Sequence, residues 1–245
     1  MEKFPVSICP KKCVGCGLCA ADCVCGSISV IDGKAQVTGS RCLECGHCFA
    51  ICPSGAVSMS EYDGSQIEPA ALPGAIDPAL LLRVMKSRRS VRQFSAKKVS
   101  EAELAMLLEA GRFCPTAKNM QDVHFTVITN VAPAEEKAWK FFSSEPLSVA
   151  GNSFFKGAPL VILISAIRPD DAGLAASYME LMAHSLGLGA FYSGYFTRTV
   201  KNNPELMEYF TVPEGKEPVA TLVIGHPAVS YARTAPRKPL NVNFI

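Results

Sequence analysis

The strongest constraint in this sequence is a repeat of four cysteines near its start. The first copy consists of Cys13, Cys16, Cys19 and Cys23, and the second copy, 29 residues further on, of Cys42, Cys45, Cys48 and Cys52. The match continues beyond the cysteines, because Gly17 recurs as Gly46 and each copy closes on a short apolar segment. The sequence therefore predicts two copies of one structural unit, each ending in a short strand, at 28–30 and at 57–59.

These thiols are better suited to metal binding than to disulfides. The chain has 11 cysteines, ten of them between Cys9 and Cys52, and in a small secreted protein such a density would indicate a disulfide framework. The residues at the start of the chain, however, lack the apolar run of an export signal. Metal ligation is the interpretation that remains.

The spacing within each copy, C-x2-C-x2-C-x3-C, is typical of 4Fe-4S clusters. Three thiolates on one tight loop hold one face of a cubane, while the fourth cysteine leaves on a helix and reaches the other cluster. The predicted ligand sets are therefore crossed: Cys13, Cys16, Cys19 and Cys52 for one cluster, and Cys42, Cys45, Cys48 and Cys23 for the second. Zinc is the alternative, but zinc sites usually pair two CxxC units.

Over residues 5–60 this pattern resembles the bacterial two-cluster ferredoxins. One departure is that Cys52 is followed by the expected proline, whereas Val24 follows Cys23. The resemblance implies a ferredoxin-like domain with two 4Fe-4S clusters.

Three cysteines lie outside the two ligand sets. Cys25 occupies the position equivalent to Ser54, which favours a packed small residue, and exchange with Cys23 as a cluster ligand is the alternative. Cys9 is predicted to be structural. Cys114 is predicted to be a buried thiol rather than a nucleophile, because no pairing with a histidine can be identified around it.

The composition changes after residue 60. Residues 61–77 are rich in Gly, Pro, Ser and Ala and lack apolar periodicity, which indicates a linker between an N-terminal domain (1–60) and a second domain (78–245). In the second domain, helix-start signals and apolar spacing predict helices that begin at Pro78, Glu101, about Ala172 and Pro204. Runs of β-branched residues predict strands over 123–129, 160–166 and 219–224. Because regular βαβ alternation is missing, the predicted fold class is α+β.

Charge and hydropathy say little about partners. The formal net charge of +2 gives no bias toward nucleic acid or toward a membrane surface. The longest apolar run, 159–166, has the length of a strand, whereas a membrane span needs roughly 20 apolar residues. We expect a soluble, cytoplasmic protein that binds neither nucleic acid nor membranes.

A dense group of arginines follows the first predicted helix of the second domain. Residues 87–92 read Ser-Arg-Arg-Ser-Val-Arg, and three guanidinium groups at this spacing suit a phosphate and a flavin ring that takes on negative charge. A solvated basic face is the alternative for this segment alone. Three further elements follow, at 115–121 (Pro-Thr-Ala-Lys-Asn-Met-Gln), 186–195 (ending Tyr-Ser-Gly-Tyr) and 225–239 (Gly-His-Pro, then Pro-Arg-Lys-Pro).

In their order and separation, these four elements resemble the nitroreductase family over residues 78–240. The resemblance implies an FMN-dependent oxidoreductase that forms a homodimer with flavin at the interface. It implies that Arg88, Arg89 and Ser90 contact the FMN phosphate and ribityl chain. Arg92 would lie near N1 and O2 of the ring, where positive charge stabilises the reduced, anionic flavin.

The same resemblance assigns contacts further along the chain. Ser193 and Gly194 match a turn whose backbone N–H approaches flavin N5. Arg237, or failing that Lys238, matches the last phosphate ligand. Asn152 is a weaker candidate for the edge of the ring.

One loop is assigned to the partner subunit. Pro115, Thr116 and Ala117 would cover FMN from across the dimer, and Asn119 would support that loop. The family often has Pro-Trp after the glutamine, whereas Gln121 precedes Asp-Val-His here, so ring contacts near this loop are not carried over.

Several other residues have a simpler interpretation. Gly187-Leu188-Gly189 follows a predicted helix and lacks a third glycine, so it is interpreted as a helix end and tight turn rather than a dinucleotide fingerprint. Phe154, Phe155, Tyr178 and Tyr192 are candidates to line a substrate pocket, although a core position is expected for each.

The resulting hypothesis is an iron-sulfur flavoprotein that passes electrons between 4Fe-4S clusters and FMN to reduce a nitroaromatic, a quinone or a similar acceptor. A ferredoxin or NAD(P)H would be the donor, and no side chain is predicted to act as a catalytic residue. One alternative is an NAD(P)H-driven nitroreductase with the clusters as electron outlet. Another is a non-catalytic electron carrier or redox sensor. A purely structural role for the clusters is a further alternative.

Overall fold

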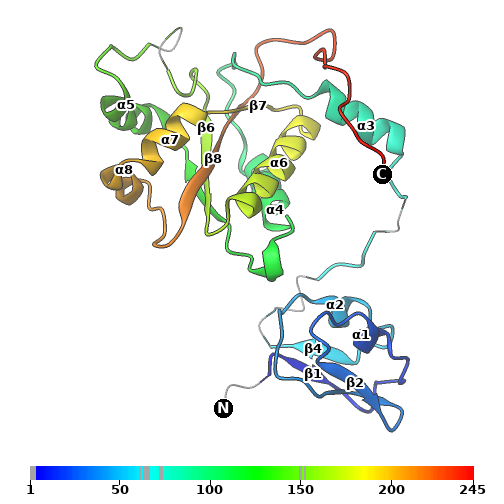
Figure 1. The fold of residues 1–245 in the computed structure, drawn as a ribbon. Coiled ribbons are helices and arrows are strands. Elements are labelled where there is room, and N and C mark those ends of the chain that lie inside the picture. Colours follow the sequence, from blue (N-terminus) through cyan, green and yellow to red (C-terminus); the bar gives the residue numbers. More distant parts are fainter. Residues whose placement is uncertain (1–3, 61, 63–66, 72–73, 149–150, 152) are drawn as a thin grey trace. The chain divides into compact units, whose positions relative to one another are not determined.

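The chain is described by a computed structural model that covers residues 4–60, 62, 67–71, 74–148, 151 and 153–245. It divides into two compact units, drawn in Figure 1. The N-terminal unit comprises residues 1–72 together with 117–120, and the C-terminal unit comprises residues 73–116 and 121–245. The division falls within the segment 61–77 that is predicted to be a linker.

The N-terminal unit is built from two small antiparallel strand pairs and two single-turn helices. Its elements are β1 (Val6–Ile8), α1 (Leu18–Ala21), β2 (Ile28–Ile31), β3 (Lys34–Val37), α2 (His47–Ala50) and β4 (Val57–Met59). Strand β1 pairs with β4, and β2 pairs with β3. The β2–β3 hairpin turns at Asp32 and Gly33, both at positive φ (51° and 72°), as a two-residue turn that matches the strand twist requires.

The sequence repeat is also a repeat of backbone conformation. Helices α1 and α2 each follow a glycine in the left-handed region, Gly17 (φ 77°) and Gly46 (φ 74°). The second equivalent pair, Gly26 and Gly55, also matches, with φ values of 61° and 60°. A side chain would strain the backbone at all four positions, which explains the glycines. The strands predicted to close the two copies are present as β2 and β4.

The core of the N-terminal unit is small and rich in sulfur. Its buried residues are Cys13, Cys19, Ile28, Ala35 and Ala56, with the partly buried side chains of Ile8, Ala20, Cys23, Cys48, Ile51 and Cys52 packed against them. Large aliphatic and aromatic side chains, which usually fill a core, make up little of this cluster.

The C-terminal unit holds an antiparallel sheet in the order β5-β6-β8-β7. The strands are β5 (His124–Ile128), β6 (Leu160–Ala166), β7 (Gly189–Tyr192) and β8 (Glu217–Gly225). The helices are α3 (Pro78–Ser87), α4 (Glu101–Arg112), α5 (Val131–Phe142), α6 (Pro169–Ser185), α7 (Gly194–Lys201) and α8 (Pro204–Tyr209). Within the described residues, none of the helices has both the length and the apolar character that crossing a bilayer requires.

Strand β6 lies at the centre of this unit and is buried along its whole length. Val161 and Leu163 pack into an apolar layer with α5, α7 and α8, while the alternate residues Ile162 and Ile164 pack into a second layer with α4 and α6. The two layers follow from the period-two alternation of side chains along a strand. Figure 1 shows the same division of the helices.

The predicted α+β class is confirmed, together with most predicted elements. Strand β6 has the predicted bounds, and the predicted capping box opens α4, where Ser100 N donates to Glu103 Oε2 (2.7 Å) and Glu103 N to Ser100 Oγ (3.2 Å). Helix α6 begins earlier than predicted, at Pro169. Helices α5 and α7 and strand β7 were not predicted from the sequence.

The burial of β6 predicts a large stability effect. Leu163→Ala should lower the free energy of unfolding by about 2–5 kcal/mol, because Leu163 is fully buried and its truncation leaves a cavity. Leu240→Ala is the matched control, since Leu240 is 87% exposed and should change stability by less than about 0.5 kcal/mol. Urea unfolding of both variants measures the difference, and equal effects would contradict the proposed core.

Candidate functional site

The arginine segment after α3 lies along the edge strand of the sheet. Ser90 and Ala190 form a parallel bridge, and Val91 N donates to Ala190 O (3.0 Å). Further along, Ser95 N donates to His226 O (2.8 Å). The segment therefore runs beside β7 and then beside the chain that leaves β8. Two of the sequence elements that resemble the nitroreductase family, 186–195 and 225–239, thus lie next to it.

A glycine makes this close approach possible. A Cβ at Gly189 would lie 2.6 Å from Val91 Cβ, which is too close for any side chain to fit without movement. Just before it, Leu188 N donates to Ala183 O (2.8 Å) and Gly187 N to His184 O (3.1 Å), with Gly187 at φ 73°. This is a Schellman motif, so the interpretation of 187–189 as a helix end and turn is confirmed.

The turn at Ser193–Gly194 is held by buried polar groups. Ser193 Oγ donates to Phe154 O (3.0 Å) and Ser193 N donates to Thr221 O (3.0 Å). Thr197 Oγ1 donates to Ser193 O (3.1 Å). The Ser193 hydroxyl is already used in a hydrogen bond within the protein. The groups of this turn that can bind a ligand are therefore the first N–H groups of α7, which have no acceptor within the helix.

Glu180 on α6 connects the arginine segment to the end of β7. Its Oε1 lies 2.5 Å from Arg88 Nη1, and its Oε2 accepts a hydrogen bond from Tyr192 Oη (3.3 Å). The carboxylate is buried, with 6% of the residue exposed. Although Tyr192 is partly exposed, desolvation of its hydroxyl beside Glu180 and then the negative charge of Glu180 raise its pKa. One turn further along α6, His184 Nε2 lies 3.0 Å from Ser87 Oγ.

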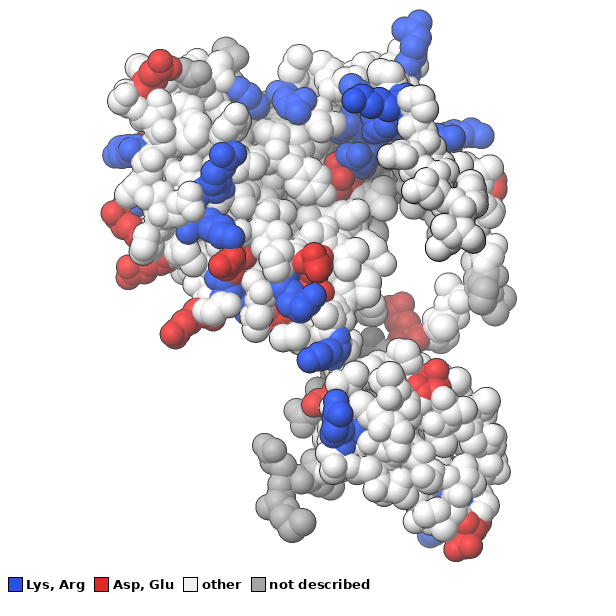
Figure 2. Space-filling model, viewed as in Figure 1, with Lys and Arg blue, Asp and Glu red and all other residues white. Residues whose placement is uncertain are grey.

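The other two arginines lie over aromatic rings. Arg89 Cζ is 5.3 Å from the centroid of the Tyr231 ring, and Tyr231 Oη donates to Ser90 O (3.4 Å). Arg92 Cζ is 5.8 Å from the centroid of Phe191 on β7. Cation–π contacts of this kind orient guanidinium groups. Figure 2 shows Lys and Arg gathered over the region of α3 and the C-terminal segment.

The remaining predicted flavin residues lie on exposed segments. Arg237 and Lys238 are exposed near the C-terminus, and Pro115 is exposed after α4. Thr116 Oγ1 accepts a hydrogen bond from Gln121 N (3.0 Å). The predicted ring-edge residue Asn152 lies outside the described residues.

Residues 117–120, including the 3-10 turn Ala117–Asn119, group with the N-terminal unit. There Asn119 Nδ2 donates to Glu44 O (2.9 Å) and to Tyr62 Oη (3.3 Å). The structure thus places Asn119 in a hydrogen-bonded network, and its predicted role as a support of the loop that carries Pro115, Thr116 and Ala117 stays a prediction.

The four aromatic residues considered for a substrate pocket divide into two pairs. Phe154 (3% exposed) and Phe155 (0%) belong to the core, as expected. Tyr178 and Tyr192 are each 42% exposed, so the core position expected for them is wrong. Cys114 is buried, burial raises its pKa, and its thiol lies 3.9 Å from Asp171 O, in agreement with an unreactive thiol.

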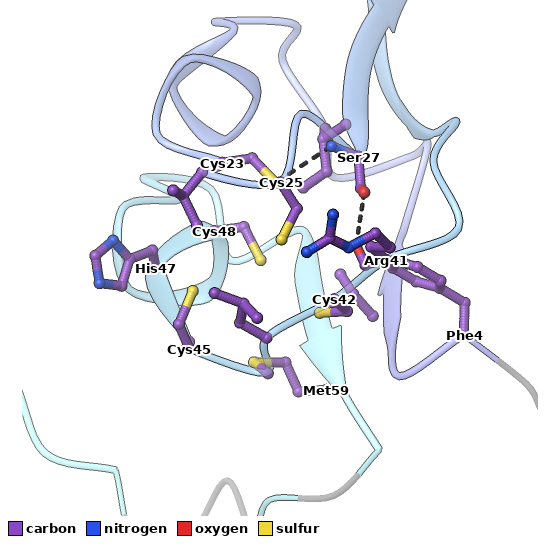
Figure 3. A pocket seen from close by; sticks show the side chains of 15 residues that line it. Phe4, Cys23, Cys25, Ser27, Arg41, Cys42, Cys45, His47, Cys48 and Met59 are labelled. Atoms are coloured by element: carbon purple, nitrogen blue, oxygen red, sulfur yellow. Dashed lines mark hydrogen bonds between the residues drawn. The ribbon is translucent and has the colours of Figure 1, made fainter. Parts of the chain in front are cut away.

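The repeat cysteines of the N-terminal unit surround two pockets. One pocket is lined by Cys13, Cys16, Cys19 and Cys52. The second, shown in Figure 3, is lined by Cys23, Cys25, Cys42, Cys45 and Cys48. The cysteines that line each pocket include all four members of one predicted, crossed ligand set. Ligation of a cluster by these cysteines stays a prediction.

A single bound metal ion needs several ligand side chains close together. Thiolates around one tetrahedral zinc lie about 3.8 Å apart, because Zn–S bonds are about 2.3 Å long. Among the described residues, no three His, Cys, Asp or Glu side chains come together closely enough to hold one metal ion.

Backbone N–H groups point at several of these sulfurs. Ala35 N donates to Cys13 Sγ and Ala56 N to Cys52 Sγ, both at 3.3 Å. The hydrogen bonds lower the pKa of Cys13; at Cys52 burial acts in the opposite direction, but the hydrogen bonds together outweigh it and the pKa is lowered. Burial raises the pKa of Cys48 to about 11. Thiols with different proton affinities therefore share one small unit.

Comparison with known proteins identifies the C-terminal unit. The model of the nitroreductase family matches residues 85–226, more than half of the chain. The chain therefore belongs to the nitroreductase family. The enzyme class predicted from the sequence, a nitroreductase-like FMN-dependent oxidoreductase, is confirmed.

Individual relatives agree with this assignment. A Bacillus subtilis protein named FMN reductase [NAD(P)H] is 29% identical over 187 residues, covering 65% of this chain and 70% of the relative. A nitroreductase structure with bound FMN from Bacteroides fragilis aligns with a TM-score of 0.59 and 21% identity, covering 67% of this chain and 98% of that one. A structure in complex with FMN from Desulfovibrio desulfuricans aligns with a TM-score of 0.55 and 26% identity, covering 68% of this chain and 94% of that one.

The Gly189 contact yields a prediction with an internal control. Gly189→Ala should destabilise the C-terminal unit by about 1–3 kcal/mol, because the new methyl group displaces Val91 and the arginine segment. Gly173→Ala on α6 meets nothing within 4 Å and should be neutral or stabilising by up to about 1 kcal/mol, since Ala favours helix. Thermal unfolding of both variants measures the two effects, and a neutral Gly189→Ala would contradict the close approach.

Proposed function

We propose that this chain is an iron-sulfur flavoprotein oxidoreductase that passes electrons between two 4Fe-4S clusters and FMN and reduces an organic acceptor such as a nitroaromatic or a quinone. The observation that supports this most directly is that one chain combines the arginine segment beside the Ser193–Gly194 turn with two pockets lined by thiols.

The residues of the C-terminal unit fit FMN. Arg88, Arg89 and Ser90 would hold the phosphate and ribityl chain, where guanidinium groups match phosphate oxygens. The first N–H groups of α7, beside Ser193, would face the ring. Arg92 is oriented by Phe191 and would supply positive charge near the ring. Arg237 or Lys238 would complete the phosphate contacts.

The donor sets of the N-terminal unit fit iron-sulfur clusters. Each pocket offers the four thiols of a predicted set, and backbone N–H groups already donate to sulfurs in both pockets, at Cys13, Cys52, Cys23 and Cys42. Hydrogen bonds to the ligating sulfurs are a principal means by which proteins set cluster potentials. The two-cluster, ferredoxin-like identity of this unit is part of the proposal.

When bound, clusters of this type transfer single electrons, and FMN exchanges electrons in ones or pairs. The protein's part is to bind and orient. Glu180 fixes the Arg88 guanidinium, and the hydrogen bonds around Ser193 fix the turn before α7. No side chain is required as a nucleophile.

We further propose that the active form is a homodimer with FMN at its interface. Helix α3 leads directly into the arginine segment and has no buried residue, although it contains Leu80, Leu81, Leu82 and Met85, each at least 40% exposed. An apolar helix face of this kind is typical of a protein interface. The loop with Pro115, Thr116 and Ala117 would then approach the partner's flavin.

The decisive experiment uses the full chain, purified without oxygen and supplied with FMN, iron and sulfide. Reduced ferredoxin should bleach both the cluster and the flavin absorbance, and turnover of a nitroaromatic or a quinone should follow. Protein that binds no iron, or clusters that are reduced while FMN stays oxidised, would contradict the proposal. Complete reduction without any turnover would instead favour a carrier or sensor.

A second candidate function is an NAD(P)H-driven reductase with the clusters as electron outlet. The name of the Bacillus subtilis relative, FMN reductase [NAD(P)H], favours this direction of electron flow. Stopped-flow mixing with NADH or NADPH distinguishes the two candidates, because rapid flavin bleaching by a nicotinamide supports the second.

The proposed FMN contacts can be tested at Arg88. Arg88→Lys should weaken FMN binding about 10- to 100-fold, because lysine keeps the charge but loses the planar fork that pairs with phosphate. Arg168→Lys is the matched control and should leave the affinity unchanged, because Arg168 is exposed at the start of α6, at the opposite end of that helix from Glu180. Quenching of flavin fluorescence on titration gives both affinities, and equal affinities would remove Arg88 from the site.

A further inference from the structure

The second thiol pocket contains one more cysteine thiol than a cluster needs. A 4Fe-4S cluster takes four thiolates, whereas the lining of this pocket includes five cysteines. The additional one is Cys25, and Figure 3 shows its side chain beside Cys23 and Cys48, within the group of labelled thiols. The first pocket has four cysteines and no fifth in its lining.

The repeat supplies an internal comparison for this position. Cys25 is equivalent to Ser54, two residues after the fourth cysteine of its copy, and Ser54 also lines its own pocket. Ser54 Oγ lies 3.7 Å from Cys52 Sγ. The backbone turns in the same way in both copies, since Gly26 N donates to Cys23 O (2.9 Å) and Gly55 N to Cys52 O (3.3 Å). The equivalent turn therefore places the Cys25 side chain next to Cys23.

The two side chains differ in what they can do at this position. A serine hydroxyl can donate a hydrogen bond to the neighbouring sulfur, whereas a cysteine can lose its proton and bind iron. Cys23 is still the favoured ligand, because Ser27 N donates to Cys23 Sγ (3.4 Å), as Ala56 N does to Cys52 Sγ in the other copy. Cys25 thus lies next to the predicted ligand Cys23, has a thiol that can bind iron, and belongs to neither predicted ligand set.

We propose that Cys25 is a reserve ligand of the second cluster, able to replace Cys23. This inference rests on the proposed clusters. In the exchange, the iron bond to Cys23 breaks and one to Cys25 forms. The proton leaves the Cys25 thiol and is taken up by the departing Cys23 thiolate, and the iron keeps its oxidation state. The first cluster has no such reserve, because serine occupies the equivalent position.

The test measures iron and acid-labile sulfide in the full chain after anaerobic reconstitution. Wild type and Cys25→Ala should each hold about eight irons, as two cubanes require. Cys23→Ala should also retain about eight, with an altered electron paramagnetic resonance spectrum of the reduced protein. The double variant Cys23→Ala/Cys25→Ala should fall to about four. Cys23→Ser, which preserves side-chain volume, repeats the single substitution in a form less disturbing to folding.

The other copy of the repeat gives the matched control. Cys52→Ala should lose one cluster, because Ser54 cannot replace the thiolate, and Cys52→Ala/Ser54→Cys should recover it. FMN content reports in each case on whether the C-terminal unit has folded.

The outcomes distinguish a failure of cluster binding from a failure of the proposed role of Cys25. If wild type bound no iron, the proposed clusters themselves would be wrong. If wild type held about eight irons but both Cys23 variants fell to the level of the double variant, only the role of Cys25 would be overturned. A failure of Ser54→Cys to recover the first cluster would likewise count against this position as a ligand site.

Discussion

The C-terminal unit depends on the burial of β6 on both faces. A strand that packs Val161 and Leu163 into one layer and Ile162 and Ile164 into the other can only lie inside a sheet covered twice by helices. This sandwich leaves β7 at one edge of the sheet, where a segment without regular secondary structure can approach. The arginine segment occupies that edge, and its position follows from the way the core is closed.

The site residues are positioned by backbone contacts more than by their own side chains. The bridge at Ser90, the glycine at 189 and the buried hydroxyls around Ser193 fix where the chain runs. Glu180 then fixes how Arg88 points. A site with basic side chains over aromatic rings needs such supports, because unsupported arginines lose many rotamers on binding.

Local signals in the sequence were sufficient to predict some helices and strands and to recognise the cysteine repeat. Strand β6 is a continuous apolar run, α4 has a complete capping box, and the repeat shows its own period. Helices α5 and α7 were missed because neither begins with a proline at its first position or with a capping box, and β7 because its four residues are too short to show a pattern. Glu180 had no local signal, since its partner Arg88 is 92 positions away.

The sulfur-rich core of the N-terminal unit has a consequence for how the protein is made. Cysteine occupies positions there that Leu or Phe would fill in an ordinary small domain, so little apolar surface is available to drive collapse. If the pockets take clusters, as proposed, metal insertion supplies much of the folding free energy of this unit. Folding of the N-terminal unit would then follow metal insertion, and iron supply would decide how many chains become fully folded.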